Sequence, residues 1–181
     1  MTIDANFRSA LAALVVAAAL TGCGSSDPAA GVSAKIFHES LQLIPATEIA
    51  RQPPQAPFRA LLEWWRLAQY RDAAGALQHF TPAARQAVRA GFGSLIYNDF
   101  GPWLQHVRPA LLRSETSGSK TTLFLELSIR EVLSPTVVRN RSDYVAIPMQ
   151  RVRGQWLISD PTFYQENAQR VHAQRTQSAK Q

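Results

Sequence analysis

The sequence predicts an α+β domain in which helices come first along the chain and pack on one face of an antiparallel sheet. In the first half, apolar residues recur with the spacing of a helix, and in the second half they alternate as in a strand with one buried face. Glycine and proline pairs separate these segments. Because successive strands are joined by tight turns with no helix between them, the sheet should be antiparallel.

The helical half opens with an apolar stripe and continues through two N-cap signals. Asp72 is placed to cap a short second helix, and Thr81-Pro82 places an N-cap threonine before a proline in the first turn. We expect this third helix to run to about Ala90 and to end at Gly91-Phe92-Gly93. The stripe of the first helix consists of Phe58, Leu61, Leu62, Trp65 and Ala68.

The remaining chain is predicted to form one interrupted helix and two hairpins. Leu95–Val107 has a helical pattern, which Gly101-Pro102 must break or kink and Pro109 should end. Pro161 should end the last strand. The first hairpin pairs Ala110–Thr116 with Lys120–Val132 across Ser117-Gly118-Ser119, and the second pairs Tyr144–Val152 with Gln155–Asp160 across Arg153-Gly154.

The composition is that of a folded protein and excludes a cysteine-based framework. Of 181 residues, 46% are apolar and 18% are charged, which favours a packed core over disorder. The single cysteine excludes an intramolecular disulfide framework and a cysteine-based structural zinc site. The four histidines have no paired spacing, so no metal site is predicted, and no cofactor is expected.

Residues 1–22 are typical of a bacterial export signal. Arg8 precedes an apolar run from Ala10 to Leu20. As a helix this run would be about 16 Å long, whereas the hydrocarbon core of a bilayer is roughly 30 Å thick. The run is therefore too short to span a membrane comfortably and fits the apolar part of a signal peptide.

The apolar run ends in Leu20-Thr21-Gly22-Cys23, which resembles the lipobox of bacterial lipoproteins. The resemblance implies transfer of diacylglycerol to the Cys23 sulfur and cleavage between Gly22 and Cys23. Two or more acyl chains hold a protein firmly on a bilayer. We therefore expect an extracytoplasmic lipoprotein, anchored by acylated Cys23 to the cell membrane or the outer membrane. The sequence leaves open which of the two membranes it is.

After the cleavage site, the chain is predicted to contain a tether, one domain and a tail. Residues 23–56 hold the lipidated cysteine and a flexible segment rich in proline, serine and glycine. Apolar residues between Lys35 and Ile44 leave open that part of this segment docks on the domain. The domain is predicted over residues 57–164, and residues 165–181 form a polar, basic tail.

Three segments resemble the nuclear-transport-factor-2-like superfamily, whose domains are cones of helices packed against a curved sheet. They are the aromatic-rich helix Leu62–Asp72, the following helix running into Phe80–Arg85, and the closing hairpin Arg151–Asp160 with its Gly154-Gln155-Trp156 strand. The resemblance implies the same cone here. Such a cone usually encloses a pocket, so the function must be argued from the residues of the site and not from the fold.

If the cone holds a pocket, five residues are candidates to line it. In ketosteroid isomerase, an enzyme of this superfamily, a carboxylate base and Tyr or Asp donors lie inside the cone. No residues here match that catalytic set, so we predict no catalytic residue. Trp65 and Trp156 are predicted as core anchors. The candidate pocket residues are Trp64, Tyr97, Asp99, Trp103 and Tyr144, of which Asp99 and Tyr97 would be the first to carry chemistry.

Arginines around the strand hairpins are candidates for binding an anionic partner. The chain carries a formal net charge of +6. Export would separate the domain from nucleic acid, which leaves lipid headgroups, a cell-envelope polymer or an acidic protein surface as partners. The alternative is that these arginines form a solvent-exposed face that binds no partner. The candidate patch consists of Arg130, Arg139, Arg141, Arg151 and Arg153, several of which should share one rim.

Together these features predict a lipid-anchored protein of the cell envelope whose domain binds a partner or a small ligand without catalysis. The alternative is a small-molecule enzyme or carrier of the ketosteroid-isomerase type. That alternative requires an open cavity into which at least one carboxylate and one Tyr or His point.

Overall fold

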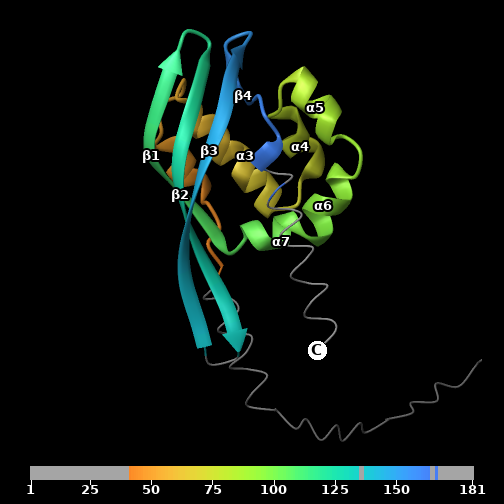
Figure 1. The fold of residues 1–181 in the computed structure, drawn as a ribbon, viewed down its shortest axis with the longest axis vertical. Coiled ribbons are helices and arrows are strands. Elements are labelled where there is room, and N and C mark those ends of the chain that lie inside the picture. The colour runs from red at the N-terminus through yellow and green to blue at the C-terminus, as the bar shows by residue number, and fades with distance from the viewer. Residues whose placement is uncertain (1–40, 135–136, 164–165, 167–181) are drawn as a thin grey trace, which may run out of the picture.

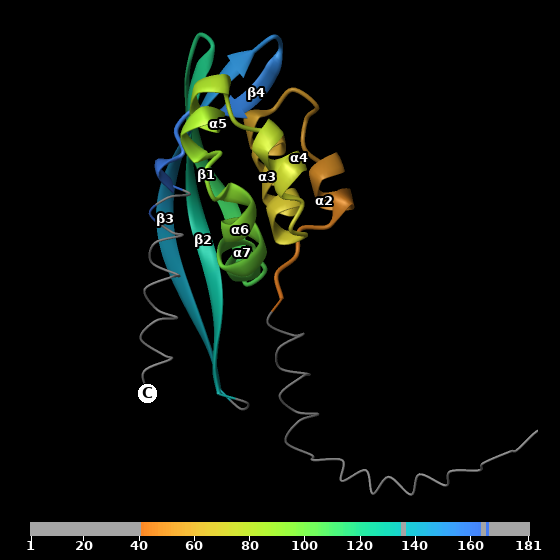
Figure 2. The same cartoon turned by 90° about the vertical axis from the view of Figure 1, so that its right-hand side faces the viewer.

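The computed structural model describes residues 41–134, 137–163 and 166, and these form helices on one face of an antiparallel sheet (Figure 1). The predicted export signal, Cys23 and the predicted tail beyond residue 166 lie outside the described residues. The sheet has the order β1-β2-β3-β4, and the helices cover a single face of it (Figure 2). The predicted α+β class is therefore confirmed. The elements are α2 (Ala46–Ala50), α3 (Pro57–Gln69), α4 (Ala73–Gln78), α5 (Pro82–Val88), α6 (Phe92–Asn98), α7 (Phe100–Leu104), β1 (Val107–Ser117), β2 (Lys120–Ser134), β3 (Val137–Val152) and β4 (Gln155–Ile158).

Both predicted N-caps are present. The Asp72 carboxylate accepts the Gly75 N–H at 2.8 Å at the start of α4, and the Thr81 hydroxyl accepts the Ala84 N–H at 3.3 Å at the start of α5. Thr81 also donates its own backbone N–H to Ile158 at 2.9 Å. The link between α4 and α5 is thereby tied to the last strand of the sheet.

The predicted break in Leu95–Val107 occurs, but one turn earlier than Gly101-Pro102. Asp99, with φ of −125°, separates α6 from α7. Proline lacks the N–H that would bond the carbonyl four residues before it, and its ring would clash with that carbonyl. The helix therefore ends before this position and begins again at Phe100, which leaves Pro102 in the first turn of α7, where no intrahelical donor is needed.

Both hairpins form, and β3 is longer than predicted. It begins at Val137 and not at Tyr144, because its first half is polar and lacks the alternation that identified the other strands. Pro109, expected to end a helix, lies within β1 instead. β1 is an edge strand, where a residue without an N–H is tolerated. At the β3–β4 turn, Arg153 and Gly154 both have positive φ, 50° and 85°, as a two-residue hairpin of type I′ requires.

The far ends of β2 and β3 project beyond the rest of the domain (Figures 1 and 2). β1 pairs with β2 only as far as Ile129, and the Arg130 N–H donates to the His106 carbonyl at 2.9 Å. The residues of β2 after Arg130 pair with β3. We call this part, residues 130–134 of β2 and 137–141 of β3, the distal hairpin. No helix covers it.

Residues 42–56, which the sequence assigned to a flexible tether, pack on the domain. Ile44 is fully buried, and Ile49 of α2 is buried as well. The Gln42 N–H donates to Gln105 at 2.6 Å. Farther along, the Trp156 indole donates to the Gln55 carbonyl at 3.0 Å. The packed domain therefore begins before residue 57, because apolar residues of the expected tether find a place against the helices.

Candidate functional site

Aromatic rings fill the space between the helices and the sheet. Trp64 and Trp65, neighbours on α3, are both fully buried and meet edge to face with ring centroids 5.8 Å apart. Phe163, 8% exposed, stacks on Trp65 at 5.9 Å and meets Phe100 at 6.1 Å. The indole N–H of Trp64 has no hydrogen-bond acceptor and lies among aromatic rings. Trp65 is a core anchor as predicted, and Trp64 is one too.

Gln69 is a buried polar residue that joins four parts of the chain. Its side-chain oxygen accepts the Ile44 N–H at 2.9 Å. Its side-chain nitrogen donates to the carbonyls of Gln42 at 3.0 Å and Leu104 at 2.8 Å and lies 3.5 Å from that of Val107. Sequence reasoning missed this residue. The sequence did contain a sign of it, because Gln69 follows Trp65 by four residues and so lies on the apolar stripe of α3, where a polar residue is expected to be buried.

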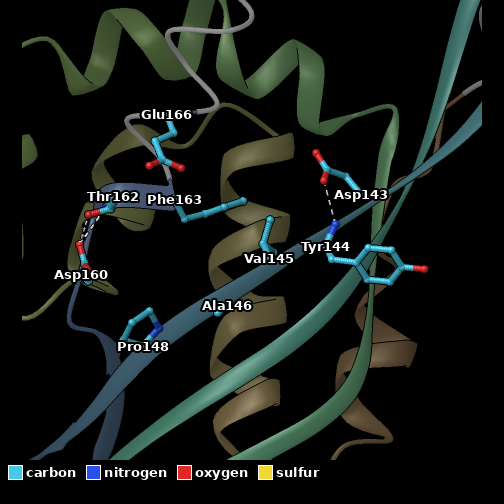
Figure 3. Close-up of a pocket in the computed structure, with 9 residues that line it drawn as sticks. All are labelled: Asp143, Tyr144, Val145, Ala146, Pro148, Asp160, Thr162, Phe163 and Glu166. Atoms are coloured by element: carbon cyan, nitrogen blue, oxygen red, sulfur yellow. Dashed lines mark hydrogen bonds between the residues drawn. The ribbon is translucent and has the colours of Figure 1, made fainter.

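A cavity of about 300 Å³ lies between β3 and the residues that follow β4 (Figure 3). Three carboxylates line it, from Asp143, Asp160 and Glu166, together with Val145 and Phe163. Phe163 points toward Val145 and closes the inner side (Figure 3). The Thr162 hydroxyl donates a hydrogen bond to the Asp160 carboxylate and has the largest effect on its pKa, which it lowers. The Thr162 backbone N–H donates to the same oxygen and lowers the pKa further, so Asp160 stays ionised at neutral pH. This cavity offers mainly hydrogen-bond acceptors.

The predicted pocket residues come from different parts of the described domain. Tyr97, on α6, is 58% exposed, and Asp99 lies at the junction of α6 and α7. Trp103 stacks on Phe100 at 5.4 Å. Tyr144 borders the cavity beside β3, but its ring, 67% exposed, points away from it (Figure 3). With Trp64 in the core, the four residues other than Tyr144 line neither this cavity nor the one beside Arg130 described below.

His79, at the end of α4, is half-buried. Burial lowers the pKa of His79, while the nearby Glu63 carboxylate and the Ala60 backbone act in the opposite direction. The ring is therefore neutral at pH 7. The His79 carbonyl accepts the Ile158 N–H at 2.8 Å, which places this residue in the link between α4 and the sheet.

The predicted arginine patch is divided between the two ends of the sheet. Arg151 and Arg153 lie at the β3–β4 turn, where Arg151 donates to the Gly154 carbonyl and the Gln55 side chain. The other three lie in the distal hairpin. Ten residues of β2 separate Lys120, opposite Gln150, from Arg130, which corresponds to roughly 33 Å of strand. The five arginines therefore do not share one rim.

In the distal hairpin, one glutamate holds two arginines and the third has no carboxylate. Arg139 donates to Glu131 at 2.5 and 2.9 Å, and Arg141 approaches the same carboxylate at 3.6 Å. No acidic group of the described residues lies within ion-pair distance of Arg130, and its Nε is buried without a hydrogen-bond partner. Arg130 borders a cavity of about 470 Å³ lined by Gln42, Ser128, Ile129, Arg130, Asn140, Arg141 and Ser142.

The face of the sheet opposite the helices carries an exposed tyrosine, Tyr144, and a half-buried phenylalanine, Phe124. Leu123, Leu125 and Leu127 of β2 point to the helices, so Phe124 and the residues that alternate with them point away. Phe124 lies under the Arg113 guanidinium, 4.1 Å from the ring centre. Tyr144 pairs with Glu126, two residues from Phe124 on the same face. Leu112, an extra residue at a β-bulge in β1, is exposed at the edge of this sheet.

No protein-family model matches the sequence, and no curated protein matches it. Three solved structures are similar in part. RPA3114, a SEC-C motif containing protein from Rhodopseudomonas palustris, has a TM-score of 0.44 and 15% identity over 61% of this chain and 80% of its own. A protein called Rd1NTF2_05, with five substitutions, has a TM-score of 0.41 and 11% identity, over 54% of this chain and 87% of its own. A protein of unknown function with a cystatin-like fold, from Nostoc punctiforme, has a TM-score of 0.40 and 11% identity, over 65% of this chain and 90% of its own.

Likenesses of this size assign neither a family nor a function. Among the described residues, no three His, Cys, Asp or Glu side chains are grouped so that they could hold a metal ion. None of the described helices has the length and apolar character to cross a bilayer. The function must therefore be argued from the resemblance of residues 20–23 to a lipobox and from the surfaces of the domain.

Proposed function

We propose that this chain is a lipid-anchored protein of the bacterial cell envelope whose α+β domain binds a protein partner without catalysis. The anchor is Cys23 of the lipobox. The binding surface is the face of the sheet that no helix covers. The observation that carries the choice of a protein partner is that the interior of the domain is filled while this outer face is left exposed.

The filled interior argues for surface binding. Trp64, Trp65, Phe100 and Phe163 occupy the place between helices and sheet where a small ligand would lie. Protein interiors packed in this way have few voids larger than a water molecule. A ligand in this space would have to displace Phe163 from its stack on Trp65.

The outer face has the chemistry of a protein interface. Tyr144 and Phe124 supply aromatic surface, and Arg113 covers Phe124 with a guanidinium that has a second contact at Glu115, 2.9 Å away. Aromatic residues and arginine are enriched at interfaces because they bury large areas and still form polar contacts. An acidic or aromatic partner surface would fit this face.

The alternative, an enzyme or carrier of the ketosteroid-isomerase type, is less well supported. It requires a carboxylate together with a Tyr or His donor inside a cavity. The cavity beside β3 supplies Asp143, Asp160 and Glu166, while the Tyr144 ring turns away from it. The Thr162 hydroxyl and N–H in this cavity are already bonded to Asp160, so they are not available to stabilise an oxyanion.

Replacing Cys23 with alanine should abolish acylation and release the protein from membranes. The thiol is the only cysteine in the chain, so no other side chain can replace it as the acceptor of diacylglycerol. The measurement is metabolic labelling with palmitate, followed by separation of membrane and soluble fractions. Ser25→Ala is the matched control and should label normally. Continued labelling of the C23A variant would exclude the anchor.

A photo-crosslinking residue at position 144 should capture a partner in intact cells, and one at position 97 should not. Tyr97 is the matched control because it is similarly exposed, 58% against 67%, but lies on α6 and not on the open sheet face. Crosslinked bands are compared by mass spectrometry. Equal capture from both positions, or none from position 144, would contradict binding through the sheet.

A further inference from the structure

The distal hairpin combines an exposed valine, Val137, with three arginines and a single glutamate. Val137 is 47% exposed, and the sequence from Val132 to Val138 contains no charged residue. The two strands that flank this uncharged segment carry Arg130 and Glu131 on β2, and Arg139 and Arg141 on β3. The hairpin therefore has an apolar end and, immediately behind it, a net positive charge of 3 − 1 = +2.

Arg130 is suited to receive an anion. Its Nε is buried without a partner, whereas Arg139 and Arg141 share Glu131. The adjacent cavity is lined by hydroxyl and amide groups of Ser128, Asn140, Ser142 and Gln42. Hydroxyls and amides can donate to phosphate oxygens, and a guanidinium binds phosphate through parallel N–H groups.

The chain enters the domain at the same place. Gln42 lines the cavity beside Arg130, and the first described residues lie at the end of the domain from which the distal hairpin projects (Figures 1 and 2). The sequence places 17 residues, 24 to 40, between Cys23 and Leu41. A flexible chain of that length spans roughly 23 Å. A lipid on Cys23 would therefore hold this end of the domain close to the bilayer.

We propose that the distal hairpin rests on an anionic phospholipid surface, with Val137 and Val138 in the interfacial region and Arg130, Arg139 and Arg141 on headgroup phosphates. This proposal rests on the proposed lipid anchor and adds an orientation to it. The domain would stand with its β1–β2 and β3–β4 turns away from the membrane, which leaves the outer face of the sheet accessible to a partner. Each arginine near an anionic surface favours the docked state about fivefold.

The test uses the full-length lipidated protein reconstituted in vesicles, with an environment-sensitive fluorophore on Val137→Cys. Acylated Cys23 is blocked, so the introduced thiol is the one that reacts. In vesicles containing 30% phosphatidylglycerol, we expect a blue-shifted probe that lipid-borne quenchers reach. Ser119→Cys, exposed in the turn between β1 and β2, is the matched control and should remain aqueous.

The second part of the test changes the charge of the protein and the lipid composition of the vesicles. Arg130→Gln should lower the ratio of docked to undocked hairpin about fivefold, and Arg153→Gln at the far end of the sheet should not change it. Vesicles of phosphatidylcholine alone should give weak quenching. A Val137 probe as aqueous as the Ser119 probe in phosphatidylglycerol vesicles would overturn the proposal. Fluorophore found on Cys23 by mass spectrometry would instead show that the anchor itself had failed.

Discussion

Replacing Gly101 with alanine should strongly destabilise the domain. A Cβ at this position would lie 2.1 Å from the Ile96 carbonyl oxygen and 2.9 Å from that of Ala68. Both are backbone atoms, in α6 and α3, so no side-chain rotation can relieve the contact. Overpacking of this kind costs about 3 kcal/mol, a large fraction of the stability of a small domain.

The matched control is Gly93→Ala. Gly93 lies in α6, is exposed, and has no atom within 4 Å of an added Cβ. Alanine is a better helix former than glycine, so this variant should be unchanged or more stable by about 0.5–1 kcal/mol. Urea unfolding followed by tryptophan fluorescence measures both variants. A G101A variant as stable as the wild type would show that α7 does not pack against α3 as described.

Replacing Gln69 with leucine should lower the free energy of unfolding by about 3 kcal/mol or more, although the side chain keeps its approximate volume. The substitution leaves the Ile44 N–H and the Leu104 carbonyl without their partner. A buried polar group that loses its partner costs about 1–3 kcal/mol. Because Gln42 and Ile44 are both held by this side chain, the segment before α2 should also detach.

Two measurements separate these effects. Urea unfolding gives the loss of stability, and hydrogen exchange reports the protection of the Ile44 amide, which should fall more than that of amides in β2. Gln86→Ala, exposed on α5, is the matched control and should change neither. Unchanged protection of Ile44 in the Q69L variant would contradict the role given to Gln69.

Local signals were sufficient for most of the fold. Asp72 and Thr81 are N-caps because a side-chain oxygen next to free backbone N–H groups needs no distant partner. The alternation at Leu123, Leu125 and Leu127 predicted the buried face of β2 for the same reason. The prediction was wrong for the first half of β3, where Arg139 to Asp143 are polar and their pairing with β2 supplies the regularity.

The candidate site was less predictable, because it depends on which residues meet across the fold. Trp64 is among the candidates predicted to line a pocket, yet Phe80, Phe100 and Phe163 surround it. For the arginine patch, the sequence predicts only that several of its members share one rim. The register of β2 on β3 places Arg130, Arg139 and Arg141 at one end and Arg151 and Arg153 at the other.

The sequence by itself determined the α+β order of elements and the caps and turns, and it carries the resemblance to a lipobox on which the proposed anchor rests. Each of these depends on residues that are neighbours along the chain. Only the tertiary structure decided that aromatic rings pack between the helices and the sheet, and that residues 42–56 belong to the domain. It also decided that Arg130, which pairs with no carboxylate of the described residues, lies beside Gln42. These features depend on contacts between segments far apart in sequence, which no local pattern encodes.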